Sequence, residues 1–157
     1  MTDTSRWFTR AAEKDHATAQ YELGVMCRRG EGVEQDDQAA AKWLLRSASQ
    51  GNAFAQYNLG NLYLLGQGVE LNVAQAATWT LRAAEQELPD AMYKISNLYL
   101  HGVGVEVDQQ AAINWCRKAA DAGHVEAEFH QAVLYYLNNY PVDAGRWLGK
   151  SFMNGHP

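Results

Sequence analysis

The feature that most constrains the fold is a repeat of 36 residues, the spacing from Trp7 to Trp43, which runs along almost the whole chain. When the sequence is shifted by this length, a tryptophan column and an alanine column fall into register. The columns are Trp7, Trp43, Trp79 and Trp115, and Ala19, Ala55, Ala91 and Ala127. A fixed period of roughly 20 to 50 residues is typical of solenoids, propellers and other repeat arrays. We therefore expect stacked units that share one core.

Each unit is expected to contain two helices. Apolar residues recur at three-to-four spacing from Ala55, which predicts a first helix, called helix A, of about 13 residues. Gly66 and Gly68 end it, because glycine adopts the positive φ of a helix C-cap and a tight turn. The second helix, helix B, is expected to begin after an N-cap residue in each unit, namely Asp36, Asn72 and Asp108. Gln75 follows Asn72 at capping-box spacing.

The two ends of the chain depart from the repeat. Trp7 belongs to a lone helix B, expected to start near Thr4 or Ser5, and residues 5–18 form an N-terminal cap. Full repeats follow over residues 19–54, 55–90 and 91–126. Residues 127–157 form a degenerate C-terminal cap, in which Gln131 replaces the leucine of helix A and Trp147 enters the tryptophan column only if four residues are dropped. The prediction is a single all-α domain, a solenoid of nine helices over residues 1–157.

Composition excludes several classes of protein. The net charge is -5, with acidic and basic residues interspersed, so no broad basic surface is available for nucleic acid. No apolar run approaches the roughly 18 residues needed to cross a membrane. Cys27 and Cys116 lie at non-equivalent positions of different repeats, so a disulfide between them is not expected. A reducing compartment, the cytoplasm, fits best, and a monomer is favoured.

Residues 55–87 follow the pattern A-x-Y-x-L-G-x-x-Y-x-x-G-x-G-V-x-x-D and then A-x-x-W-x-x-x-A-A, with Asn72 in place of the aspartate and Glu87 in place of a final glycine. This pattern resembles the Sel1-like repeat family. The resemblance implies a right-handed superhelix of antiparallel helix pairs, related to tetratricopeptide repeats. It also implies an adaptor that organises protein complexes, of a kind common in bacteria. The resemblance further implies that many secreted members carry a disulfide bond within each repeat. The absence of that cysteine pattern here supports a cytoplasmic protein.

In such stacks the A helices line the concave surface, which places a set of candidate binding residues on it. The candidates are Tyr21, Arg28, Tyr57, Asn61, Leu64, Tyr93, Asn97, Leu100, His101 and Phe129, with Tyr136 in the last repeat. Asparagine amides can pair with a peptide backbone and tyrosine rings provide rigid apolar area, so this surface is expected to hold a protein or peptide segment. Alternatively, the tyrosines only pack between repeats and the asparagines are merely tolerated on the concave curve. Arg28 with Arg29 could attract an acidic end of the ligand or form a solvated helix terminus.

No catalytic chemistry stands out. The segment HVEAEFH places His124, Glu126, Glu128 and His130 at helical spacing, but it is not the H-E-x-x-H motif and offers no third ligand, so a polar helix face is the alternative. The Gly-x-Gly triplets are expected to be turns, and no cofactor is predicted. We therefore expect a non-enzymatic scaffold or adaptor. An immunity or antitoxin-like inhibitor of a basic toxin is the alternative, and small-molecule or metal binding at residues 124–130 a lesser one.

Overall fold

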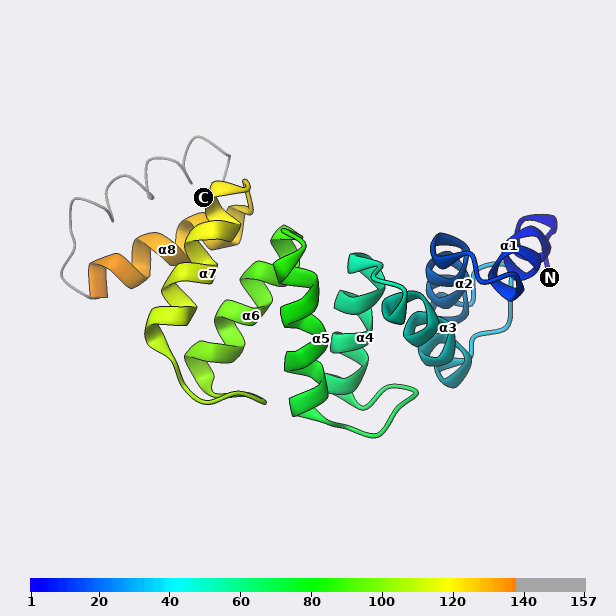
Figure 1. Cartoon of the computed structure of the whole chain (residues 1–157), viewed down its shortest axis with the longest axis horizontal. Coiled ribbons are helices and arrows are strands. Elements are labelled where there is room, and N and C mark those ends of the chain that lie inside the picture. Colours follow the sequence, from blue (N-terminus) through cyan, green and yellow to red (C-terminus); the bar gives the residue numbers. More distant parts are fainter. Residues whose placement is uncertain (138–157) are drawn as a thin grey trace. The chain divides into compact units, whose positions relative to one another are not determined.

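The computed structural model describes residues 1–137, with side chains up to residue 134, and contains eight α-helices and no strand in this part (Figure 1). The helices are α1 (Asp3–Glu13), α2 (Ala17–Arg29), α3 (Asp37–Ser49), α4 (Ala53–Leu65), α5 (Val73–Glu85), α6 (Pro89–His101), α7 (Gln109–Asp121) and α8 (Val125–Leu137). The predicted all-α class is confirmed. The ninth helix and its Trp147 lie outside the described residues.

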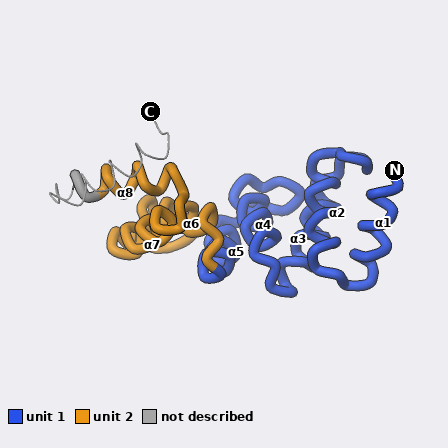
Figure 2. The backbone as a smooth tube through the Cα atoms, turned by 90° about the horizontal axis from the view of Figure 1, so that it is seen from above, with its two compact units in different colours: residues 1–86 blue, residues 87–157 orange. Residues whose placement is uncertain are grey.

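The chain divides into two compact units, residues 1–86 and residues 87–157 (Figure 2). In unit 1, each of the helices α1 to α4 packs against the next one along the chain. In unit 2, α7 packs against both α6 and α8. Helices α2, α4, α6 and α8 are the predicted A helices, and α1, α3, α5 and α7 are the B helices. No helix among the described residues is long and apolar enough to cross a membrane.

The predicted helix ends are largely confirmed. Gly30, Gly66 and Gly102 end the first three A helices in the left-handed conformation. Asp36, Asn72 and Asp108 cap the B helices that follow. Two details of the sequence prediction were wrong. The amide of Asn72 donates to the Tyr63 carbonyl, so the side chain of Gln75 does not complete a capping box. The first helix begins at Asp3, because Thr2 accepts a hydrogen bond from the Ser5 amide.

Two tryptophans of unit 1, Trp43 and Trp79, pack against the helix pair that precedes them in the chain. Trp43 lies against a cluster that includes Ala12 of α1 and Leu23 of α2. Trp79 lies in a second cluster, together with Leu44 and Leu59 of α3 and α4. Trp7 has no preceding pair among the described residues and is 67% exposed, whereas Trp79 is 8% exposed. The tryptophan of the N-terminal cap helix therefore differs in burial from that of a full repeat.

Two buried glutamines join neighbouring repeats in unit 1. The Nε2 atom of Gln20 donates to the Ala12 carbonyl, and that of Gln56 donates to the Ala48 carbonyl. Each of these glutamines also accepts a hydrogen bond from a glutamine at the end of the following B helix, Gln50 or Gln86. Because buried amides are costly unless they are paired, these bonds help to fix the spacing of the repeats.

Candidate peptide-binding surface

The A helices of unit 1 present an exposed stripe that is largely apolar. Helix α4 contains no charged residue, yet it faces solvent with Phe54 and Leu65, which are 55% and 61% exposed. Leu64 is half-buried, as is Tyr57. A helix that is apolar on nearly all sides is normally buried or binds another molecule on its free side. We call this stripe, together with the neighbouring exposed side of α2, the unit 1 face.

Several side chains of the unit 1 face lack a partner within the part of the chain that the structure describes. The amide of Asn61 and the hydroxyl of Tyr57 make no hydrogen bond there. By contrast, the Asn58 Nδ2 atom donates to the Phe54 carbonyl of its own helix at 2.8 Å. The ring of Tyr21 lies 6.0 Å from that of Phe54. Asn61 and Tyr57 are therefore available to a ligand, whereas Asn58 is already satisfied.

The equivalent tyrosine of unit 2 is fully engaged. The Tyr93 ring stacks on His124 with 4.6 Å between centroids, and its hydroxyl lies 2.8 Å from Nδ1 of His130. The Asn97 side chain also hydrogen-bonds to Tyr93, and burial raises the pKa of the phenol above its usual value. The predicted pair Tyr93 and Asn97 does share one helix face, but both side chains serve internal contacts rather than standing free.

The histidines at the start of α8 have structural contacts. The Nδ1 atom of His124 accepts a hydrogen bond from the Ala127 amide at 3.2 Å, which caps the helix. That bond leaves the proton on Nε2, which lies 3.3 Å from Asp90. Glu126 is 3.5 Å from Nδ1 of the same ring. No three histidine, cysteine, aspartate or glutamate side chains of the described residues are grouped so that they could hold a metal ion.

The contact between His130 and Tyr93 predicts a pH dependence of stability. Burial, reinforced by nearby His101, lowers the pKa of His130 below its ordinary value of 6.5. The unfolded chain therefore binds more protons in this range, and stability should fall as the pH drops below 6.5 toward the lower folded pKa. We expect the contribution of His130 to be well under about 1 kcal/mol, because the ring stays partly solvated. Urea unfolding at pH 7.5 and pH 5 should show a smaller difference for His130→Gln; an unchanged difference would contradict the assignment.

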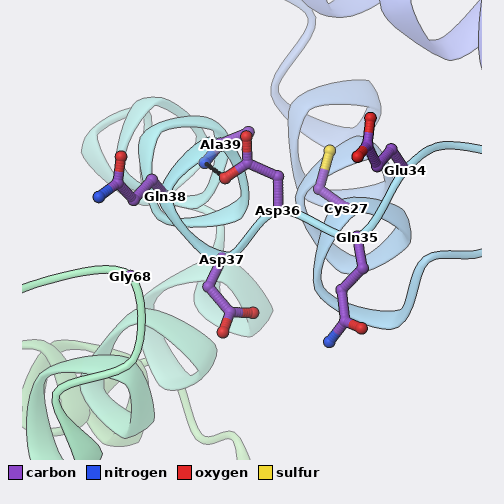
Figure 3. A pocket seen from close by; sticks show the side chains of 8 residues that line it. All are labelled: Cys27, Glu34, Gln35, Asp36, Asp37, Gln38, Ala39 and Gly68. Carbon is purple, nitrogen blue, oxygen red and sulfur yellow. Dashed lines mark hydrogen bonds between the residues drawn. The ribbon is translucent and has the colours of Figure 1, made fainter.

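The loop edge of unit 1 contains a hollow of about 620 Å³ between the first A–B loop, the start of α3 and Gly68 (Figure 3). Asp36 lines it, but its carboxylate caps the Ala39 amide at 2.9 Å. Cys27 also lines it and is buried, and burial followed by the charge of Asp36 raises its pKa. Burial raises the pKa of Cys116 to about 12. Both thiols are free, and they stay protonated at neutral pH, which is the condition of structural cysteines.

The remaining candidate residues predicted from the sequence differ in their exposure to solvent. Leu100 and Arg28 are half-buried, and His101 and Phe129 are exposed. The side chain of Tyr136 lies outside the described part. Sequence reasoning missed Phe54, although its spacing of three residues before Tyr57 places both side chains on one helix face.

The family comparison matches most of the described chain. The Sel1 repeat model matches residues 6–16, 17–52, 53–88 and 89–124. Each full repeat of the model thus begins two residues before the repeat predicted from the sequence. A protective antigen of uropathogenic Escherichia coli strains, with an SLR fold, is 34% identical at a TM-score of 0.89; the match covers 96% of this chain and 33% of that one. A Sel1 repeat protein from Oxalobacter formigenes is 32% identical at a TM-score of 0.84, with 90% and 60% covered.

More distant structures show the fold alone. Helicobacter pylori cysteine rich protein B is 19% identical at a TM-score of 0.61, and the match covers 78% of this chain and 87% of that one. The predicted solenoid of helix pairs is confirmed by these similarities. The chain spans only 33% and 60% of the first two structures, and among curated proteins none matches it.

Proposed function

Because the chain belongs to the Sel1 repeat family, whose members generally mediate protein–protein interactions, we propose that it is a non-enzymatic adaptor that holds a peptide segment of a protein partner on its A helices. The observation that carries this proposal is the unit 1 face. It combines exposed apolar side chains on an uncharged helix with the unpartnered amide of Asn61. An extended peptide presents backbone donors and acceptors that such an amide can meet, while Tyr57 supplies rigid apolar area.

The site is centred on unit 1. Tyr57 and Asn61 can contact a ligand without breaking an internal bond. In unit 2, Tyr93 would first have to give up its hydrogen bond to His130. For unit 2 by itself, Asn97, Leu100, His101 and Phe129 are the proposed contacts, secondary to those of unit 1. The free, buried thiols support a reducing compartment such as the cytoplasm.

An affinity capture from lysate of the source cell tests the proposal. We expect a partner captured by the wild type to be lost, or bound about tenfold more weakly, with Asn61→Ala, because a partner group that loses its hydrogen bond costs about 1 to 3 kcal/mol. Tyr57→Ala should have a larger effect. Asn61→Ala should melt like the wild type, since its amide has no hydrogen-bond partner in the described part of the chain. Tyr57→Ala removes a half-buried ring and should melt lower, so capture is compared at a temperature at which this variant is still folded.

Asn58→Ala is the matched control, because Asn58 lies on the same helix but its amide already bonds to its own backbone. It should capture the same proteins as the wild type. If Asn61→Ala and Tyr57→Ala capture the wild-type set with equal affinity, the A-helix site is wrong.

A further inference from the structure

We infer that the segment bound by unit 1 is apolar and carries one acidic side chain, which pairs with Arg28. This inference rests on the proposed function and specifies the chemistry of its partner. Arg28 differs from the other arginines of unit 1 in its contacts, and it stands on a face that is otherwise largely apolar.

Arg28 is the exception among the six arginines of unit 1, all of which lie in the described part of the chain. The other five each have a partner. Arg6 pairs with Asp3, Arg29 with Glu31 and Arg46 with Asp15, while Arg10, Arg46 and Arg82 each lie over the tryptophan of their own B helix. Arg28 has neither an ion pair nor an aromatic ring within the described residues, although its side chain is half-buried.

The position of Arg28 is itself a departure from the repeat. The equivalent positions of the next two repeats hold Leu64 and Leu100. The only carboxylate on α2, that of Glu22, is six residues away, which puts it about 120° around the helix and out of the i+3 or i+4 range. The end of α2 favours a cation, since the helix dipole is negative there, but a neighbouring position already provides one in Arg29.

A half-buried guanidinium without an internal counterion favours an external one. Its five donors match a carboxylate, and partial burial makes such a pair stronger than one in open solvent. On α4 the face consists of Phe54, Tyr57, Leu64 and Leu65 around the amide of Asn61, so it favours apolar anchors from the partner. A nucleic acid is disfavoured, because it would need a row of cations, whereas α4 has none and the chain carries a net charge of -5.

Selection from a display library of random 12-residue peptides on the immobilised chain tests the inference. We expect the enriched peptides to share apolar or aromatic residues and an aspartate or glutamate at a fixed distance from them. Their affinity should fall at least tenfold with Arg28→Glu. A peptide in which that acidic residue is replaced by lysine should regain binding to Arg28→Glu. Arg6→Glu, which makes the same charge change on a B helix, should leave affinity unchanged.

Arg28→Leu restores the residue of the equivalent positions and serves as the variant that keeps the fold. It should lose the acidic preference without gaining a basic one. If the enriched peptides depend on Tyr57 but show no acidic position, or bind Arg28→Glu as well as wild type, the inference about Arg28 is wrong and the proposed function stands. If no peptide is enriched, or enriched peptides ignore Tyr57→Ala, both fall.

Discussion

Replacing Gly68 by alanine should destabilise the protein by more than about 3 kcal/mol, because two separate costs coincide at this residue. Gly68 has φ of 69°, a conformation that costs an L-residue about 1 to 2 kcal/mol. A methyl group added there would also collide with the Asp37 carbonyl and lie 3.0 Å from the Gln38 amide nitrogen. Both are backbone atoms at the start of α3, so a rotamer change cannot relieve the clash. In Figure 3 the loop that carries Gly68 runs directly beside these residues.

Gly51→Ala is the matched control for the conformational cost alone. Gly51 has φ of 93°, and no atom lies within 4 Å of the position of an added methyl group. The same repeat position holds Asp15 and Glu87, each with φ of 62°, so side chains are tolerated there. We expect Gly51→Ala to cost about 1 kcal/mol in urea unfolding. Equal losses for the two variants would show that the loop of residues 66–72 moves away from α3 freely, which would contradict the close approach of Gly68 to the Asp37 carbonyl.

Most of the fold could be predicted from the sequence, since each repeated residue has a local physical role that the period makes visible. The glycines that end the A helices and the N-caps of the B helices act within a few residues of their own position. The exposure of Trp7 and of Trp79 does not follow from the residue type of the column. The two residues are identical, but only Trp79 has a preceding helix pair among the described residues, so the place of the helix in the array determines the burial.

The sequence predicts the residue types of the candidate surface but not which of their side chains already have internal partners. Tyr21 and Tyr93 occupy one column, yet the residue 37 positions later is Asn58 in one case and His130 in the other. Asn58 bonds to its own helix, whereas His130 bonds to the tyrosine. Such a difference depends on contacts between successive A helices, for which the sequence provides only the residue types.

Trp79→Ala should lower the free energy of unfolding by about 3 to 5 kcal/mol, the cost of removing a large buried aromatic side chain. Trp79 is 8% exposed and belongs to the cluster that joins α3 and α4 to α5, with Arg82 over its ring at 4.7 Å. Trp7→Ala removes the same side chain, also with an arginine over its ring, from a site that is 67% exposed. It should cost less than about 1 kcal/mol, so the difference between the two variants measures burial and excludes the cation–π contact as its cause.

Hydrogen exchange under native conditions shows how far the loss from Trp79→Ala extends. Helix pairs in a solenoid do not bury their faces alone, so neighbouring repeats are stabilised by their common interfaces. We therefore expect protection to fall in α1 and α2 as well as in α4 and α5. A loss confined to α4 and α5, with α1 and α2 as protected as in the wild type, would contradict a shared core. The tryptophan column would then stabilise single helix pairs, and the 36-residue period would reflect repetition of the sequence without cooperative folding.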